Sequence, residues 1–169
     1  MGGATMAIRT AARAVIIKDE WLLVLRRTGV QGEFYVLPGG GQNHGESIRQ
    51  ALVREVFEEV SLEVEIKELL FINEYIAVRD SMFPEVEQDV HQIDFTFLCG
   101  MITDSEAKVG STPDVHQIGI AWIPLHEITD YDLHPENDIH FIMGAPTRNV
   151  LAQWLDSKGS LITPILIEG

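Results

Sequence analysis

The spacing of apolar and polar positions predicts strands in the N-terminal part of the chain. Two runs rich in aliphatic and β-branched residues, 12–17 and 21–25, flank the polar residues 18–20, which is the pattern of a β-hairpin. The run "FYVL" at 34–37 predicts a further short strand, because Pro38 and a series of glycines follow it directly. We therefore expect this part of the chain to form antiparallel strands that end in a glycine-rich loop.

The hydrophobic period changes to that of a helix at Ser47. Between Ser47 and Val60 apolar residues recur every three to four positions, and we expect Val53, Val56, Phe57 and Val60 to face the core. Further elements follow: extended runs at 62–78, 91–102 and 118–125, polar loops at 79–89 and 103–117, a short turn or helix at 126–129, a helix at 145–158 and a final extended run at 160–168.

This order of elements predicts an α/β fold. Strands, one helix, several strands and a second helix favour a mixed β-sheet with helices packed on it over a regular βαβ array. A length of 169 residues suits one domain, and no composition shift or repeat marks a linker. We expect a flexible N-terminus at 1–8 and a single domain at 9–169.

The charge of the chain narrows the class of partner. There are 12 basic and 26 acidic residues, and the formal net charge of −14 argues against binding to a nucleic acid polymer. A phosphorylated small molecule remains compatible with this charge, because a divalent cation can bridge carboxylates and phosphate oxygens. No apolar run has the length of a membrane helix, so we expect no membrane partner. The single cysteine, Cys99, lies in an apolar run and predicts a buried thiol in a cytoplasmic protein.

The predicted helix at 47–60 carries a cluster of acids. Glu55, Glu58 and Glu59 are spaced i, i+3 and i+4 and so share one face, opposite the apolar residues of the same turns. Carboxylates about 5 Å apart repel by roughly 1 kcal/mol in water and by more at a lower dielectric constant, which favours a bound cation. Oxygen ligands suit Mg²⁺ or Mn²⁺ rather than Zn²⁺. The alternative is an acidic helix face that water solvates.

The stretch "GGQNHGES" at 40–47 precedes this helix. Its glycine spacing is close to that of a phosphate-binding loop, but Glu46 stands where such a loop has lysine. Arg54 follows Glu46 by about two helical turns, so a Glu46–Arg54 ion pair can tie the loop to the helix. Glu46 is then a structural residue and not a phosphate ligand.

Together these residues resemble the Nudix box of the MutT-like Nudix hydrolases. The matching positions are Gly40, Glu46, Arg54, Glu55, Val56, Glu58, Glu59 and Leu62. The approach "YVLPGG" at 35–40 also resembles the family, as do "WIPL" and "HEI", which extend a weaker similarity from about residue 8 to 130. The departure is Ser61, where the family has glycine, and it affects the helix exit more than the chemistry.

The resemblance implies a Nudix-type α/β/α sandwich and a Mg²⁺-dependent hydrolase. The expected substrate is a nucleoside diphosphate linked to another moiety, whose pyrophosphate bond a metal-activated water cleaves. In the family the acids at Glu55, Glu58 and Glu59, with the carbonyl of Gly39, bind Mg²⁺ or Mn²⁺. Arg54 would orient these acids and Glu46 would hold the loop. A nucleotide-type small molecule is the expected partner, and a homodimer is a further expectation from the resemblance.

The family usually adds an acid from a later loop, and here the sequence offers alternatives. Gln117 stands about where a glutamate is common, and Asp114 and Glu106 are nearby substitutes. The general base therefore stays open between Glu55 and a group of this later loop.

Further candidates lie outside the helix. Arg26 and Arg27 end a strand and are candidates for binding substrate phosphates, with a solvated strand end as the alternative. Phe34 and Tyr35 alternate, so we expect one in the core and one at the cleft. Phe34 or Tyr75 can stack on a base. Gly40, at the start of the loop, is a candidate substrate contact.

The exact substrate is not specified by these motifs. The residues that mark members acting on ADP-ribose or on diadenosine polyphosphates would stand at Ala77 or Val78, and neither marker is present. Alternatives are a sanitising pyrophosphohydrolase for oxidised nucleoside triphosphates, a nucleotide-sugar hydrolase and a non-catalytic nucleotide sensor. An intact set of acids argues against the sensor, because a binding protein does not need them all.

Overall fold

The N-terminal hairpin forms as the sequence predicts. In the computed structural model, which describes residues 7–29, 32–76, 90–103 and 105–134, strands β1 (Arg9–Lys18) and β2 (Trp21–Gly29) pair antiparallel. Asp19 and Glu20 join them, and both have positive φ, 51° and 68°. Two consecutive residues of this kind give the turn whose twist matches that of the flanking strands.

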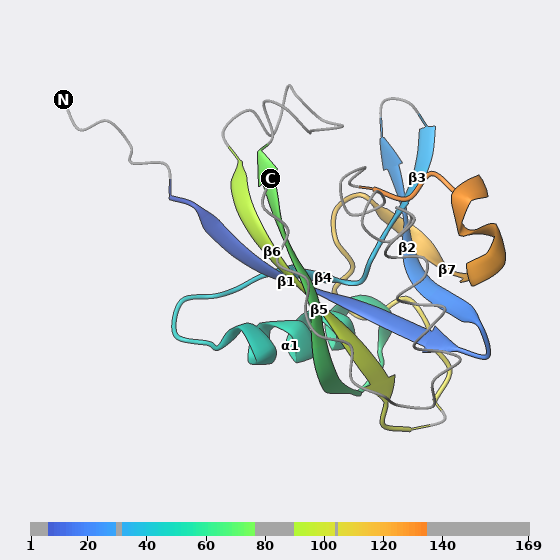
Figure 1. The fold of residues 1–169 in the computed structure, drawn as a ribbon, viewed down its shortest axis with the longest axis horizontal. Helices are drawn as coiled ribbons and strands as arrows, with labels where there is room; N and C mark the ends of the chain where they lie inside the picture. Colours follow the sequence, from blue (N-terminus) through green and yellow to red (C-terminus); the bar gives the residue numbers. More distant parts are fainter. Residues whose placement is uncertain (1–6, 30–31, 77–89, 104, 135–169) are drawn as a thin grey trace.

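These strands belong to a mixed β-sheet with the order β3-β2-β1-β6-β5 (Figure 1). The remaining strands are β3 (Gly32–Val36), β4 (Gly39–Gly41), β5 (Val64–Ile76), β6 (His91–Met101) and β7 (Gln117–Pro124). β1 runs parallel to β6, whereas β4 pairs antiparallel with β1 and β7 with β2. β5 is continuous from Val64 but shifts register after Ile66 and after Leu69, as bulges do.

The sequence predicts a glycine-rich loop directly after Pro38, and this expectation is wrong in one respect. Gly39, Gly40 and Gly41 form the short strand β4, in register with Arg13, Ala12 and Ala11 of β1. Their lack of side chains allows this close pairing, since a Cβ on Gly39 would lie 2.0 Å from the carbonyl oxygen of Ala12. The pairing fixes the start of the box against the middle of the sheet.

One helix, α1 (Ile48–Val60), packs on the sheet against β1 and β4 (Figure 1). Apolar clusters lie on both sides of β1: Ala12, Ala14 and Ile16 join the cluster that contains α1, and Val15 joins a second cluster with η1. The short helix η1 (Leu125–Asp130) is the turn expected at 126–129. This arrangement places the box helix at a sheet face with the glycine strand beside it.

The inward face of α1 differs from the sequence expectation. Val53 and Phe57 are 40% and 52% exposed, whereas Leu52, Val56 and Val60 are buried, and so is Glu59. At about 100° per residue, Leu52, Val56 and Glu59 lie on one line and Val53 and Phe57 lie to its side. The three acids therefore do not share a face opposite the core. Glu59 points inward because it has hydrogen-bonding partners there.

Cys99 is buried, as the sequence predicts. Burial raises the pKa of its thiol to about 12, which makes it unreactive. Trp122 is half-buried and packs against the core cluster of α1. The described ranges contain no helix with the length and hydropathy needed to cross a membrane.

Several expectations fall outside the described residues. They are residues 1–6 of the flexible terminus expected at 1–8, the loop at 79–89, the helix at 145–158 and the extended run at 160–168. The domain bounds 9–169 therefore stay a prediction.

Candidate active site

The start and end of α1 are fixed by capping. Ser47 is the N-cap, and its hydroxyl accepts from the backbone N–H of Gln50 at 3.2 Å while the Gln50 side chain accepts from the N–H of Ser47 at 2.8 Å. This capping box sets where the helix begins. At the other end Ser61 adopts the left-handed conformation, with φ of 55°, which costs a residue other than glycine about 1–2 kcal/mol. The serine thus takes the helix exit that a glycine adopts more easily.

Arg54 is the centre of the acidic network on α1. Its guanidinium donates to both carboxylate oxygens of Glu46, at 2.6 and 3.1 Å, so the predicted Glu46–Arg54 pair is present. It also donates to Glu55 at 2.7 Å, to Glu58 at 3.1 Å and to the carbonyl of Gly41 at 2.9 Å. The hydrogen bonds with Arg54 lower the pKa of Glu46 below its usual value. One side chain therefore ties the loop and strand β4 to two of the three acids.

Glu59 faces the interior between α1 and β4. Its Oε2 accepts from the backbone N–H of Gly39 at 2.8 Å, and its Oε1 lies 3.6 Å from Nη2 of Arg27. Burial raises the pKa of Glu59 to about 7, although the Gly39 hydrogen bond and the positive charge of Arg27 oppose the rise. The negative charge of Glu55 raises it further. A carboxyl in this position is one that a nearby cation would keep ionised.

The glycine strand brings the carboxylates close to the backbone. A Cβ on Gly40 would lie 2.6 Å from the carboxyl group of Glu55, so this carboxylate occupies the space that a side chain would fill. The carbonyl of Gly39 accepts from Nη1 of Arg13 at 2.8 Å. Glu55 and Glu59 thus approach adjacent residues of β4 from the same helix.

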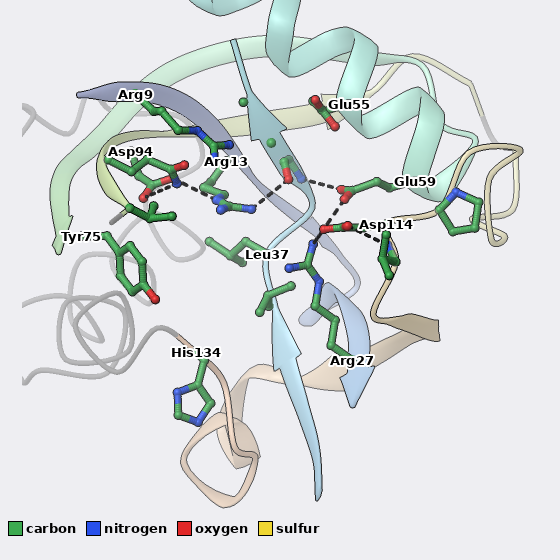
Figure 2. A pocket seen from close by; sticks show the side chains of 18 of the residues that line it. Arg9, Arg13, Arg27, Leu37, Glu55, Glu59, Tyr75, Asp94, Asp114 and His134 are labelled. Atoms are coloured by element: carbon green, nitrogen blue, oxygen red, sulfur yellow. Dashed lines mark hydrogen bonds and ion pairs between the residues drawn. The ribbon is translucent and has the colours of Figure 1, made fainter. Parts of the chain in front are cut away.

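A cavity of about 550 Å³ opens beside β4 (Figure 2). Its lining includes Arg9, Arg13, Arg27, Phe34, Leu37, Gly39, Gly40, Gly41, Glu55, Glu59, Tyr75, Gln92, Asp94, Asp114 and His134. The lining therefore combines acids from α1, arginines from β1 and β2, and polar residues from β5 and β6.

The segment after β6 closes one wall of this cavity. The backbone N–H groups of Lys108, Gly110 and Thr112 donate to the carbonyls of the last turn of α1, at 2.9–3.3 Å. A Cβ on Gly110 would lie 1.9 Å from the carbonyl oxygen of Glu58, so only glycine allows this approach. Asp114 then reaches Arg27, with Oδ2 2.5 Å from Nη2. The loop is docked on the helix that carries the acids.

The comparisons with known proteins agree with this geometry. Residues 7–143 match the family model for the NUDIX domain. The chain belongs to the Nudix family. The expected α/β/α fold class and the enzyme class, a pyrophosphohydrolase, follow from this membership and are confirmed.

Solved structures share the Nudix fold with this chain. A MutT NUDIX hydrolase from Burkholderia pseudomallei is 21% identical, with a TM-score of 0.57 over 71% of this chain and 85% of the other. An ADP-ribose pyrophosphatase from Streptococcus suis is 19% identical, with a TM-score of 0.57 over 95% and 98% of the two chains. A UDP-X diphosphatase is 19% identical, with a TM-score of 0.60 over 94% and 68%. At these identities the matches show a common fold.

The later-loop candidates of the Nudix site separate in the structure. Asp114 lines the cavity and pairs with Arg27. Gln117 donates from its amide to the carbonyl of Glu59 at 3.0 Å, so it supports the end of α1 instead of entering the cavity. Glu106 is exposed and is not among the cavity-lining residues. Asp114 is thus the candidate that the fold brings to the acids.

The neighbouring arginines of β2 also separate. Arg27 lines the cavity, whereas Arg26 pairs with Glu33 at 2.7 and 3.0 Å and does not line it. Alternation along a strand sends adjacent side chains to opposite faces, so only one of the pair can face the site. The structure therefore does not bring Arg26 together with the acids of α1.

The aromatic candidates separate in the same way. Phe34 is 3% exposed, belongs to the core cluster of α1 and also lines the cavity. Its ring packs edge-on against His134, with centroids 5.6 Å apart. Tyr35 packs against Tyr131 instead and is not among the lining residues. Tyr75 also lines the cavity, so Phe34 and Tyr75 both offer an aromatic ring there.

A polar group at the inner end of the cavity was not predicted from the sequence. Asp94 is 2% exposed, and its Oδ1 accepts from Nε of Arg13 at 3.1 Å. The amide of Gln92 donates to both oxygens of the same carboxylate, at 3.0 and 3.2 Å. The available signal was the alternation of Gln92 and Asp94 in an otherwise apolar strand, with Arg13 alone between alanines. Polar residues at buried strand positions indicate a site.

The acids of the Nudix box fit a divalent cation by their chemistry. Glu55, Glu58, Glu59 and the Gly39 carbonyl offer oxygen ligands only, which Mg²⁺ and Mn²⁺ prefer. The carboxylate of Glu55 lies in the space over Gly40, next to the backbone of Gly39. In the part of the chain that the structure describes, no three His, Cys, Asp or Glu side chains already converge on one point, since Arg54 holds Glu55 and Glu58.

Proposed function

We propose that this Nudix protein hydrolyses the pyrophosphate bond of a nucleoside diphosphate linked to another moiety, with Mg²⁺ or Mn²⁺. The observation that carries the proposal is the position of Glu55 and Glu59. Both carboxylates approach the glycines of β4 in the wall of a cavity that Arg27 also lines. Carboxylates that can bind a metal ion and an arginine that can bind phosphate thus lie at one cavity, which suits metal-assisted hydrolysis of a diphosphate.

In this proposal Glu55, Glu58, Glu59 and the Gly39 carbonyl hold the metal ion. When bound, the ion would supply charge neutralisation for the diphosphate and a lowered pKa for a water molecule. Arg54 keeps Glu55 and Glu58 in position through bonds of 2.7 and 3.1 Å. The hydrogen bond from the Gly39 N–H keeps Glu59 directed at β4.

The remaining roles concern the substrate and the proton. Arg27 places a guanidinium at the cavity wall. It can donate to phosphate oxygens once its hydrogen bond to Asp114 is broken. Glu55 and Asp114 are the candidates for the general base, because both are carboxylates of the cavity wall. Gly40 leaves the space above β4 open to Glu55, and Phe34 offers an apolar ring to a base.

The substrate class rests on similarity as well as on the site. Two of the similar structures are named as an ADP-ribose pyrophosphatase and a UDP-X diphosphatase, and both names describe a nucleoside diphosphate joined to a second group. The cavity of about 550 Å³ is large enough for a ligand of this kind. Oxidised nucleoside triphosphates are the alternative substrates, and binding without turnover is the alternative activity.

A Mg²⁺-dependent phosphate-release screen tests the proposal. The compounds are nucleotide sugars, ADP-ribose, dinucleoside polyphosphates and normal and oxidised deoxynucleoside triphosphates, each with and without EDTA. Glu58→Gln should lower turnover by at least about a hundredfold and leave the fold intact. Glu65→Gln is the matched control, because Glu65 is an exposed glutamate of β5 away from the cavity.

Two results would contradict the proposal. Turnover that is equal in Glu58→Gln and in the native protein would refute the metal assignment. Tight binding of one compound without hydrolysis of any would favour the nucleotide sensor.

We also propose a cytoplasmic location and a homodimer. The buried thiol of Cys99, the single cysteine, needs no oxidising compartment and supports the location. Light scattering of the purified protein tests the dimer, and a mass of one chain, 18.9 kDa, would exclude it.

A further inference from the structure

Among the residues that the structure describes, three arginines line the cavity, in a chain that has 12 basic and 26 acidic residues. Two of them have acidic partners within the protein. Arg13 is paired with Asp94 at 3.1 Å, and Arg27 with Asp114 at 2.5 Å. Their charges are therefore largely balanced before any ligand enters.

Arg9 differs from these two. It lines the cavity, it is exposed, and it forms no hydrogen bond or ion pair with any residue that the structure describes. Figure 2 shows its side chain beside Arg13, directed toward β4 and without a partner. Arg9 is thus the lining arginine whose positive charge no described residue compensates.

Arg9 lies beside the end of β4. A Cβ on Gly41 would lie 3.1 Å from Nη2 of Arg9, so the guanidinium occupies the space above this glycine. The next residue, Thr10, is held by two bonds to Gln42: its hydroxyl donates to the side chain at 2.5 Å, and its carbonyl accepts from the backbone N–H at 2.9 Å. The strand end that carries Arg9 is therefore tied to the end of β4.

Arg9 and Arg27 mark opposite ends of the glycine strand. Arg27 lies at the Gly39 end, near the Glu59 carboxylate that accepts from the Gly39 N–H, and Arg9 lies over Gly41. Gly39 and Gly41 are about 7 Å apart at the spacing of a strand. A diphosphate held at the acids would leave Arg9 within reach of a group that continues past Gly41.

We propose that Arg9 binds a further phosphate group of the substrate, beyond the diphosphate that is hydrolysed. This inference rests on the proposed function, because it takes the acids of α1 as the position of the hydrolysed bond. It makes Arg9 a specificity-determining residue: within the proposed class, Arg9 favours substrates whose second group begins with a phosphate, so that the chain has at least three phosphates. Arg9 has no role in the hydrolysis itself.

Calorimetry with inorganic pyrophosphate and inorganic tripolyphosphate in the presence of Mg²⁺ tests the inference independently of the base and sugar. These probes differ by one phosphate. The native protein should bind tripolyphosphate more tightly than pyrophosphate. Arg9→Gln should weaken tripolyphosphate binding by about tenfold and pyrophosphate binding by less than about threefold, because the lost bond is a charge-assisted one.

Arg49→Gln is the control for the loss of a positive charge. Arg49 is an exposed arginine of α1 that donates to the carbonyl of Ile66 and does not line the cavity. It should leave both affinities unchanged. Equal weakening of both probes by Arg9→Gln, no weakening of either, or no binding of either by the native protein would overturn the inference.

The proposed function has a separate readout. Turnover in the substrate screen tests hydrolysis, whereas the ratio of the two affinities tests Arg9. A failure of the proposed function and a failure of the inference on Arg9 therefore give different results.

Discussion

Replacing Gly39 by alanine tests the link between the glycine strand and the acids. Gly39 has φ of 137°, a conformation that essentially only glycine adopts and that costs other residues about 1–3 kcal/mol. A Cβ there would also lie 2.0 Å from the carbonyl oxygen of Ala12 and 2.9 Å from Cα of Arg13. Because both contacts are backbone atoms, β4 itself must move.

Movement of β4 adds to the cost of the strain. The Gly39 peptide accepts from Arg13 at 2.8 Å and donates to Glu59 at 2.8 Å, and a shift of the strand weakens both bonds. Forced overpacking costs about 1–3 kcal/mol, and each lost hydrogen bond about 1 kcal/mol. Because movement of β4 relieves part of the overpacking and weakens the two bonds without breaking both, we expect Gly39→Ala to lower the free energy of unfolding by about 3–6 kcal/mol, less than the sum of these terms.

Gly45→Ala is the matched control. Gly45 also has positive φ, 89°, but a Cβ there would have no atom within 4 Å. This variant should lose only about 1–2 kcal/mol, the cost of the left-handed conformation. The effect of alanine on the unfolded chain is the same in both variants and cancels.

Urea denaturation followed by tryptophan fluorescence, with EDTA present, measures the difference. The expected gap of about 3 kcal/mol corresponds to roughly 6–12 °C in Tm for a chain of this size. The reasoning would be refuted if the unfolding free energies of the two variants agreed within about 1 kcal/mol. Such agreement would show that the close approach of β4 to β1 does not affect stability.

Three further predictions concern the loop, the buried acid and the inner end of the cavity. Gly110→Ala should lower stability by about 1–3 kcal/mol and raise KM, because its Cβ would meet the Glu58 carbonyl at 1.9 Å and displace the cavity wall; unchanged urea curves would contradict this. Glu59 has a pKa of about 7 in the folded protein, above its ordinary 4.5, so the stability that its neutral form contributes is present below about pH 4.5 and lost as the pH rises through 7. In EDTA, Glu59→Gln should therefore gain stability relative to the native protein over this range, by about 3 kcal/mol at most, and a constant difference from pH 4 to 8 would argue against the shift. Asp94→Asn should lower the free energy of unfolding by about 3 kcal/mol, because it leaves Arg13 without its carboxylate partner. Glu33→Gln, which breaks the exposed pair with Arg26, is the control. A smaller effect of Asp94→Asn than of Glu33→Gln would contradict the importance of burial.

The sequence determined the parts of this protein that depend on neighbouring residues. Alternating apolar residues specify the strands, and Ser47 begins the helix because its hydroxyl can cap it locally. The Glu46–Arg54 pair follows from a spacing of eight residues that bridges a loop and two helical turns. These features could be predicted because the interacting groups are close in the chain.

The choice between equivalent positions needed the tertiary structure. The pattern could not distinguish Arg26 from Arg27, because alternation gives two faces without saying which one meets the cavity. It also assigned Val53 and Phe57 to the core, where the sheet instead receives Leu52 and the carboxylate of Glu59. A helix period fixes which residues share a side but not the rotation of that side against its neighbours.

Contacts between distant segments were decided by the tertiary structure alone. Arg13 and Asp94 are 81 positions apart, and only the parallel pairing of β1 with β6 brings them together. Gly39 becomes a strand residue because β1 passes beside it, and its N–H then holds Glu59. The sequence thus offered candidate residues for the chemistry, whereas the packing of the sheet decided which of them meet, since long-range pairing leaves no signature in local spacing.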